Sequence, residues 1–500
     1  MAVKTHSKVL NNIIRHYLKG HGFSAYAIEN ITDRIIETIS GYRSIPLKQR
    51  AFALRHGFFA EKIILYGLNE QNYKDYLSDL DYFWLHPLNG GFSHWIDDKL
   101  TLRYLLAPFS NYLPGYYYQL STSGVAKLQD CPDEFSADER GILKLLRLKS
   151  EIAGKPLIGT AGLGFFKLSC HENLLYVNDT RVSEQELINL FSQWRLSETG
   201  YIITEYLHPH PDLGRIWSKT ANSLRITVLR GSDNQAKIAY AFTRFGNSTS
   251  GVVENSVAGG IFNFIDLKTG EYNQGKIWRN DQIIDCAVHP ESGVPVCGVV
   301  PYWESIKQKL IDISDFIPQL HYLGFDVVVV ENGFKIIEIN SQPSHEFFQW
   351  FLPAYQSDVI GPFFREMLER KRLQVENGKK ARSTLNNYRN AIYSHRIFKI
   401  IRAMTSTRKT KEAFCELLKA SELFDEQWYI EKYHEVIDPG MEPVLHYLSA
   451  GAERGYDPGP EFSSKRYLEA YADVQKEGMN PLVHYVMYGR YEGRAIFKHE

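Results

Sequence analysis

Residues 321–343 read HYLGFDVVVVENGFKIIEINSQP, and this stretch predicts two buried strands joined by a tight turn. Asp326 is expected to open the first strand, because an unbroken β-branched run from Val327 to Val330 follows it. The turn signal Glu-Asn-Gly at 331–333 places a glycine where a positive φ is easily adopted. The segment 334–339 then returns as the second strand. We therefore expect a β-hairpin.

Three oxygen-bearing side chains are expected to converge at one end of this hairpin. Glu338 and Asn340 are two positions apart, so they leave the same face of the return strand, while Asp326 begins the neighbouring strand. Two carboxylates and an amide suit Mg²⁺, a hard cation that prefers oxygen ligands and accompanies nucleotide phosphates. The alternative is a hairpin whose polar residues are only solvated at the strand ends.

Composition limits the class of protein. A chain of 500 residues that is 44% hydrophobic and 13% aromatic is globular and long enough for more than one domain. The formal net charge of −1 gives no indication of a nucleic-acid partner. Five scattered cysteines without a CxxC pair favour reduced thiols over zinc. No signal-peptide pattern and no long apolar run is present, so we expect a cytoplasmic protein.

A second informative stretch is 154–168, which reads GKPLIGTAGLGFFKL. Lys155 is expected to end a strand and to lead into a loop with glycines at 159, 162 and 164. Such a loop lets backbone N–H groups approach phosphates, and the lysine neutralises their charge. It contains neither a Walker A motif nor a dinucleotide fingerprint. The alternative is an ordinary glycine-rich hairpin.

Together these stretches resemble the ATP-grasp superfamily, through the hairpin pattern "D…EIN" and the loop pattern "KP…G…G.G". Other matching pieces occur in order: a "DK" pair at 98–99, an "E.YL"-like segment at 205–207, Asn222 and Arg225 before an expected strand, Arg244 at the end of another, and a "GG" turn at 259–260. The likeness covers roughly residues 90–350 and is closest to the sugar-transfer-associated branch. It is weaker to the tubulin-tyrosine-ligase-like branch and extends to glutamate-ligase-type enzymes. The resemblance implies an α+β ATP-grasp fold, in which two α+β subdomains grip ATP.

The resemblance also implies which residues form the site. The implied nucleotide contacts are Lys99, Lys155, Gly159, Thr160, Gly162, Gly164, Lys167, Glu205, Tyr206 and Leu207. Asp326, Glu338 and Asn340 are the implied ligands of two Mg²⁺ ions. Arg225, Arg244 and Asn222 are expected to hold and neutralise an anionic transition state. Each arginine has the alternative of a surface ion pair.

The function that the resemblance implies is an ATP-dependent carboxylate–amine ligase acting through an acyl phosphate. The expected product is an amide between an amino acid or amine and a sugar carboxylate, made for a bacterial surface polysaccharide such as capsule or O-antigen. One alternative is an ATP-grasp sugar kinase. Another is a non-catalytic scaffold that recruits glycosyltransferases.

The domain organisation expected from the sequence has four parts: a helical N-terminal domain at 1–90, the ATP-grasp domain at 91–355, a basic helical linker at 356–420 and two repeats at 421–500. Residues 424–455 and 462–493 align at an offset of 38, which predicts one helical unit present twice. This pattern resembles repeats appended to bacterial glycosyltransferases and predicts a docking module for saccharide or a partner transferase.

The linker contains a strongly basic segment, with fourteen Lys/Arg against three Glu between 365 and 411. A basic amphipathic helix of this kind is typical of peripheral contact with an anionic membrane surface, here the inner face, or with the phosphates of a lipid-linked saccharide. The alternative is an ordinary linking helix with a solvated basic face.

Overall fold

The computed structural model describes residues 2–42, 44–159, 162–251, 254, 259–279, 282–378, 408–438, 440–476, 478–490 and 492–499. The chain divides into two compact units, Ile64–Lys371 and the combination of Met1–Ile63 with Arg372–Glu500. The domain boundaries expected from the sequence remain predictions. Among the described residues, no helix combines the length and the apolar character that crossing a membrane requires.

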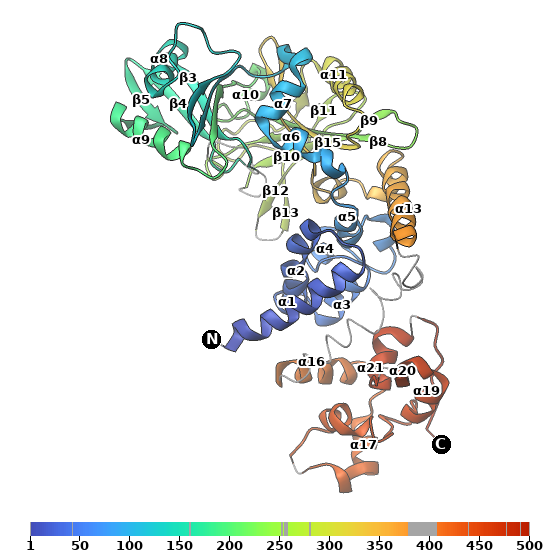
Figure 1. Ribbon diagram of the computed structural model, residues 1–500. Coiled ribbons are helices and arrows are strands. Elements are labelled where there is room, and N and C mark those ends of the chain that lie inside the picture. The colour runs from blue at the N-terminus through green and yellow to red at the C-terminus, as the bar shows by residue number, and fades with distance from the viewer. Residues whose placement is uncertain are drawn as a thin grey trace. The chain divides into compact units, whose positions relative to one another are not determined.

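The first sheet of the 64–371 unit has seven strands, each antiparallel to its neighbours, in the order β2-β1-β7-β3-β4-β5-β6. Its strands are β1 (Tyr116–Ser121), β2 (Gly124–Lys127), β3 (Glu151–Pro156), β4 (Phe166–His171), β5 (Leu174–Val177), β6 (Thr180–Val182) and β7 (Tyr201–Glu205). Helices α8 (Glu139–Lys149) and α9 (Glu184–Arg195) pack against this sheet (Figure 1). Ser183 begins α9 with a capping box, which fixes where that helix starts.

The second sheet also has seven antiparallel strands, in the order β13-β12-β10-β9-β8-β15-β16. Its strands are β8 (Leu224–Arg230), β9 (Ala236–Phe245), β10 (Ile261–Phe264), β12 (Gly275–Arg279), β13 (Gln282–Cys286), β15 (Tyr322–Val330) and β16 (Gly333–Asn340). A separate two-stranded sheet pairs β11 (Glu271–Tyr272) with β14 (Gly298–Val299).

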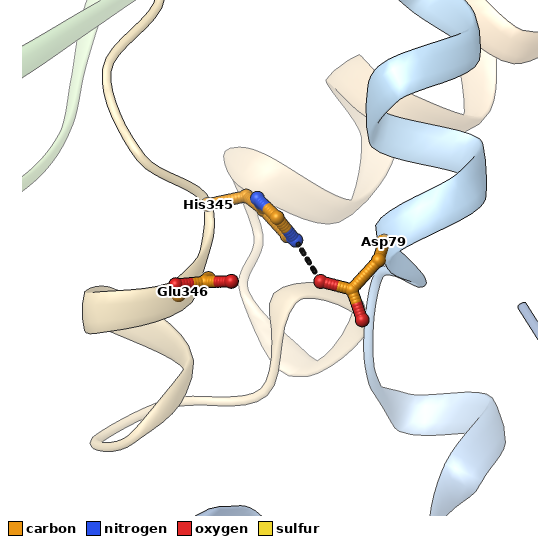
Figure 2. Close-up of side chains that lie close together, drawn as sticks. All are labelled: Asp79, His345 and Glu346. Carbon is orange, nitrogen blue, oxygen red and sulfur yellow. Dashed lines mark hydrogen bonds and ion pairs between the residues drawn. The ribbon is translucent and has the colours of Figure 1, made fainter. Parts of the chain in front are cut away.

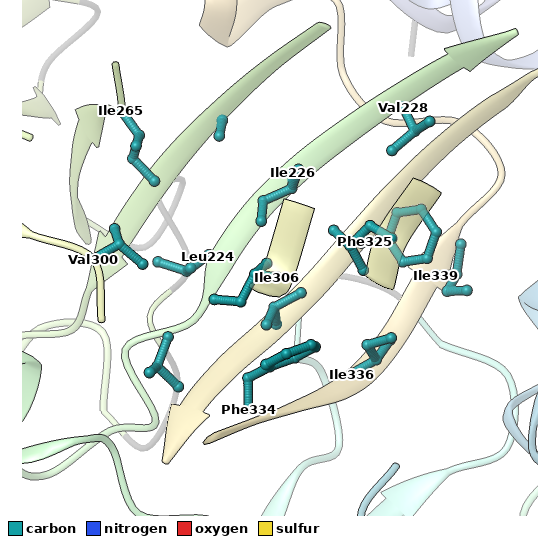
Figure 3. Packing of buried hydrophobic residues seen from close by; sticks show 14 of the residues in the cluster. Leu224, Ile226, Val228, Ile265, Val300, Ile306, Phe325, Phe334, Ile336 and Ile339 are labelled. Atoms are coloured by element: carbon teal, nitrogen blue, oxygen red, sulfur yellow. The ribbon is translucent and has the colours of Figure 1, made fainter. Parts of the chain in front are cut away.

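One face of the second sheet is the core of this unit. Alternate residues of β8 and β15, among them Ile226 and Phe325, are fully buried. They pack against α11 (Trp303–Phe316), whose Ile306 lies in the same cluster (Figure 3). Because side chains alternate across a strand, the residues between them point to the opposite face. The polar side chains of these strands are thereby left facing away from α11.

The expected hairpin is present as β15 and β16, but Asp326 does not open its strand. β15 begins at Tyr322, so Asp326 is in its middle. The reason is long-range pairing, because Tyr322 to Val327 align residue by residue with β8. Position 324 of this strand requires glycine, because a Cβ there would come within 2.7 Å of Pro343. The carboxylate is therefore held by strands on both sides.

Shorter helices complete the 64–371 unit. They are α5 (Asp79–Leu85), α6 (His94–Asp97), α7 (Lys99–Leu105), α10 (Pro211–Gly214) and α12 (Glu346–Gln349), with α13 (Ile360–Gly378) running to its end. Asp98 caps the start of α7 by accepting a hydrogen bond from the Thr101 amide at 2.6 Å. The part of the basic segment between 379 and 407 lies outside the described residues.

The other unit is helical. Its N-terminal part contains α1 (Ala2–Gly20), α2 (Ala25–Ser40) and α3 (Leu47–Arg55), and α4 (Lys62–Leu65) begins at its boundary. Its C-terminal part contains α16 (Arg408–Lys419), α17 (Glu426–Tyr433), α18 (Pro443–His446), α19 (Ser464–Ala470), α20 (Ala472–Lys476) and α21 (Pro481–His484). α18 and α21 lie 38 residues apart, and so do the helical turns at 447–451 and 485–489 that follow them.

Candidate active site between the two sheets

Both sheets contribute side chains to one cavity in the 64–371 unit. The lining residues include four cationic and four anionic side chains: Lys99, Lys155, Arg225, Arg244, Glu205, Glu254, Asp326 and Glu338. Predicted site residues Gly159, Gly162, Tyr206, Leu207 and Asn340 also line it. The fold thus brings most of the predicted residues together, from segments that are far apart in the sequence.

Cross-strand pairing explains why the charged side chains meet. Asp326 of β15 lies directly opposite Glu338 of β16 on one side and Arg225 of β8 on the other. Directly opposite residues of antiparallel strands project from the same face of the sheet. These three side chains therefore form a row across three strands.

Asp326 is held by two arginines. Arg225 donates from Nε to Asp326 Oδ1 at 2.5 Å and from Nη2 to Oδ2 at 3.2 Å. Arg244 Nη2 lies 3.0 Å from Asp326 Oδ2. Burial acts to raise the pKa of Asp326, but the two guanidinium groups outweigh it and hold this pKa below its usual range. The Asp326 carboxylate is thus kept ionised by the two guanidinium groups.

Glu338 is in the opposite electrostatic situation. Burial raises its pKa above the usual range, and the partial compensation by Lys99 is opposed by Asp326. The Lys99 ammonium lies 3.9 Å from Glu338 Oε1, which is the outer limit of an ion pair. The neighbouring Asn340 donates its amide N–H to the Gly324 carbonyl at 3.3 Å, which leaves its amide oxygen as an acceptor. A cation close to Glu338 and Asn340 would fit this arrangement.

The two lysines lie at the glycine-loop end of the cavity. Burial, and then the nearby Lys99 charge, lower the pKa of Lys155 to about 8. Lys99 Nζ also donates to the Gly159 carbonyl at 3.4 Å. Gly164 follows in the loop with φ +76°, a backbone conformation that favours glycine. Thr160 lies outside the described residues.

Glu205 ends β7 and is fastened to the start of β1. Its carboxylate accepts a hydrogen bond from the Gly115 amide at 3.0 Å, and its own amide donates to the Gly115 carbonyl at 2.8 Å. Tyr206 and Leu207 follow at the edge of the cavity, and burial raises the pKa of Tyr206 to about 12. This segment therefore presents a fixed backbone edge and a neutral ring to the cavity.

Three predicted residues are not among those that line the cavity. Lys167 forms an ion pair with Glu151 at 2.7 Å and lies over the ring of Tyr206. Asn222 is buried with φ +50° and hydrogen-bonds to Thr220 and to backbone carbonyls, including that of Trp217. Gly164 is the third. In this structure the polar groups of Lys167 and Asn222 are engaged by the protein itself.

Several lining residues did not emerge from the sequence. Glu254 accepts hydrogen bonds from the amide and the hydroxyl of Ser223, and Arg244 donates to the same hydroxyl at 2.6 Å. Tyr240 and Phe242 precede Arg244 at alternate positions of β9. Their period-2 spacing with Arg244 is the sequence signal that would have found them. Phe262 and Phe347 carried no comparable signal.

The segment after Asn340 is held in place by contacts with α5. Figure 2 shows His345 hydrogen-bonded to Asp79 of α5, with the Glu346 side chain beside them. The His345 Nε2 and Asp79 Oδ1 atoms are 3.0 Å apart, and both residues are buried. Tyr82 adds a hydrogen bond from its hydroxyl to the Pro343 carbonyl at 2.5 Å, and its ring stacks on His345. These contacts fix the chain directly behind the Glu338 and Asn340 positions.

Asp79, His345 and Glu346 are also, among the described residues, the one group of three His, Cys, Asp or Glu whose ligand atoms lie within 4.8 Å of one another. The predicted metal ligands Asp326, Glu338 and Asn340 line the cavity but include only two residues of these types.

Two antiparallel sheets that enclose a charged cavity, with a glycine-rich loop at one end, define an ATP-grasp protein. Within that class, the chain belongs to the sugar-transfer associated ATP-grasp family, which residues 92–353 match. A comparison with curated proteins finds no match. The likeness to the tubulin-tyrosine-ligase-like branch and that of the C-terminal repeats to glycosyltransferase-associated repeats remain predictions.

Solved structures that match part of this chain are only distantly similar. N5-carboxyaminoimidazole synthase from Aspergillus clavatus, in complex with ADP and 5-aminoimidazole ribonucleotide, shares 9% identity over 55% of this chain and 52% of its own, with a TM-score of 0.30. D-alanyl-alanine synthetase A from Vibrio cholerae shares 9% over 55% and 65%, with a TM-score of 0.34. D-alanine–D-alanine ligase from Bacillus anthracis shares 12% over 58% and 71%, with a TM-score of 0.30.

Proposed function

We propose that this chain is an ATP-dependent ligase that joins a carboxylate to an amine through an acyl phosphate. The observation that carries the proposal is the row formed by Glu338, Asp326 and Arg225, which lines the same cavity as the lysines of the glycine-loop end. Anion-binding and cation-binding groups in one cavity are what a magnesium-nucleotide complex needs. Membership of the ATP-grasp family supports this assignment.

ATP and Mg²⁺ fit the charges of the cavity. Burial and the neighbouring Lys99 lower the pKa of Lys155, and a phosphate bound beside the two ammonium groups would offset both effects. Burial raises the pKa of Glu338 although cations lie near it, and a bound Mg²⁺ would favour its ionised form. Lys99 and Lys155 are therefore proposed to hold phosphates, and Glu338, Asn340 and Asp326 to hold Mg²⁺. Glu205 to Leu207 are proposed to border the adenine.

In the proposed reaction, a carboxylate oxygen of the acid attacks the γ-phosphorus of ATP, and ADP leaves. The amine then attacks the acyl carbon, loses a proton and expels phosphate, so the products are amide, ADP and phosphate. Arg225 and Arg244 would neutralise charge that develops on the transferring group, since together they exceed the charge of Asp326. The main contributions of the protein are positioning and charge neutralisation.

The acid is proposed to be a sugar carboxylate, in surface-polysaccharide biosynthesis. Support comes from the family description, which associates its members with sugar transfer. The acceptor amine is proposed to be an amino acid or another small amine. A docking role for the C-terminal repeats belongs to the same proposal.

The test is ADP release by the full-length protein with Mg-ATP and a panel of uronic acids and amines, with product masses determined. A product equal in mass to acid plus amine minus water supports the ligase. A product that gains one phosphate assigns a sugar kinase instead. ATP that binds without turnover for any pair counts against the ligase, and failure to bind ATP supports the scaffold alternative.

A further inference from the structure

The part of the cavity next to the two arginines is lined by aromatic rings. Phe242 lies directly opposite Arg225 across β8 and β9, and Phe262 lies directly opposite Arg244 across β9 and β10. Pairing of this kind places both rings on the arginine-bearing face of the sheet. Phe242, Phe262 and Phe347 all line the cavity. On this face of the sheet, the side chains therefore change from charged to aromatic between one strand and the next.

The aromatic wall is defined as Phe242, Phe262 and Phe347. Packing between aromatic rings holds it in place. Phe347 of α12 meets Phe262 edge-to-face, with ring centroids 5.7 Å apart. Trp350 packs against both rings, at 4.7 Å from Phe347 and 5.1 Å from Phe262. Because these neighbours restrict its rotation, the partly exposed Phe347 ring is preorganised to receive a ligand.

The wall itself carries no charge. On the side of Phe262 away from Arg244, the residue directly opposite is Lys276, and its ammonium pairs with Asp285 at 2.6 Å. The Tyr240 hydroxyl beside the wall donates to the Ser344 carbonyl at 3.1 Å. A ligand that covers the wall should therefore present an uncharged, flat surface there, while its anionic group points to the arginines.

We propose that this wall and the two arginines form the acceptor-acid subsite, and that its ligand is a carboxylated saccharide whose ring face covers the aromatic rings. This inference rests on the proposed ligase function. The C–H face of a pyranose is apolar and slightly positive, so it complements the negative face of an aromatic ring. The carboxylate attached to that ring would reach Arg225 and Arg244 within the same cavity.

A free amino acid fits the subsite less well. Its ammonium is bonded to the same carbon as its carboxylate, so binding would bring a cation beside Arg225 and Arg244. Charge complementarity at the arginines therefore favours an acid that carries no ammonium.

The experiment is isothermal titration of the full-length protein with D-glucuronate and D-galacturonate, in the presence of Mg²⁺ and a non-hydrolysable ATP analogue. Succinate and L-phenylalanine serve as an open-chain acid and an amino acid. Phe347→Ala is expected to weaken uronate binding roughly 3- to 10-fold, which is the range that aromatic contacts supply. Phe347→Leu keeps an apolar side chain without the ring and should show a similar loss.

Phe351→Leu is the matched control, because Phe351 belongs to the same aromatic cluster but does not line the cavity. Its uronate affinity should equal that of the wild type. The inference is overturned if neither uronate binds, if succinate or L-phenylalanine binds as tightly as the uronates, or if both Phe347 variants retain full affinity.

Parallel assays of ADP release separate this inference from the proposed function. Ligation of a different acid, without uronate binding, would leave the ligase standing and remove the saccharide subsite. Uronate binding that depends on Phe347, without any amide product, would retain the subsite and remove the ligase.

Discussion

The Asp326 carboxylate pairs with two arginines, and this pairing determines its charge state. The carboxylate remains ionised because Arg225 and Arg244 lower its pKa despite its burial. Glu338, one strand away, lies 3.9 Å from the Lys99 ammonium, and burial raises its pKa although Lys99, Arg225 and Lys155 act to lower it. The two carboxylates lie opposite each other but differ in their electrostatic surroundings. A bound cation would therefore stabilise the charge of Glu338 more than that of Asp326.

Replacing Glu338 by glutamine is expected to lower ADP release at least about 100-fold, because it removes the charge that a cation near the phosphates requires while keeping the shape. Glu331→Gln, in the exposed turn of the same hairpin, is the control and should retain wild-type turnover. The measurement is a coupled assay of ADP release at saturating Mg²⁺. Wild-type turnover in the Glu338 variant would exclude the assigned cation site.

The lowered pKa of Lys155 predicts that ATP binding depends on pH. Its pKa of about 8 means that the free protein loses this charge as the pH rises through 8, whereas bound phosphate favours the protonated form. ATP affinity should therefore be full below pH 8 and fall above it, by at most about 10-fold per pH unit. Titrations between pH 7 and 9.5 measure this.

The Lys155→Arg variant is the control for this pH dependence, because a guanidinium stays protonated throughout the range. Its ATP affinity should be nearly constant between pH 7 and 9.5. An equally steep fall in the variant would assign the dependence to another group.

At the scale of elements, the first sheet and α9 are joined by very close packing. Gly154 of β3 lies under the indole of Trp194, and a Cβ at this position would come within 2.4 Å of that ring. Trp194 in turn stacks on Tyr201 of β7 at 4.6 Å between centroids. This contact sets the position of β3, the strand that carries Lys155 to the cavity.

Gly154→Ala is expected to destabilise the protein by about 1–3 kcal/mol, because the added methyl group overpacks this contact. Gly91→Ala is the matched control, since a Cβ there meets nothing within 4 Å and should cost little. Urea unfolding followed by circular dichroism gives both values. Equal midpoints for the two variants would contradict the packing argument.

At the scale of the whole molecule, the cavity belongs to the 64–371 unit, and the C-terminal repeats belong to the other unit. The repeats share internal contacts at the offset of 38. Tyr429 hydrogen-bonds to His446 Nδ1 at 3.0 Å, and Tyr467 to His484 Nδ1 at 2.9 Å. All four residues are buried. Both histidines thus pack in the cores of their repeats.

Tyr429→Phe and Tyr467→Phe are each expected to lower the free energy of unfolding by about 1 kcal/mol, since each removes one buried hydrogen bond. The two losses should be similar because the contacts are equivalent. Chemical denaturation of the two full-length variants measures them. A large loss for one and none for the other would show that the two repeats are not energetically equivalent.

The sequence was sufficient for the α+β ATP-grasp class, because the hairpin, the glycine-rich loop and their order along the chain are local patterns. Strand periodicity also placed Glu338 and Asn340 on one face before any strand partner was known. The predicted start of the first hairpin strand at Asp326 was wrong, because pairing with β8 extends β15 back to Tyr322. The roles of the proposed site residues remain predictions.

Only the tertiary structure decided which side chains meet. Arg225 and Asp326 are 101 positions apart and become neighbours because β8 pairs with β15. The aromatic wall depends on β9, β10 and α12 converging, and Lys167 turns to Glu151 rather than lining the cavity. Periodicity determines the face of a strand on which a residue projects. The choice of neighbouring strand follows from burying apolar surface across the whole unit, which no local pattern encodes.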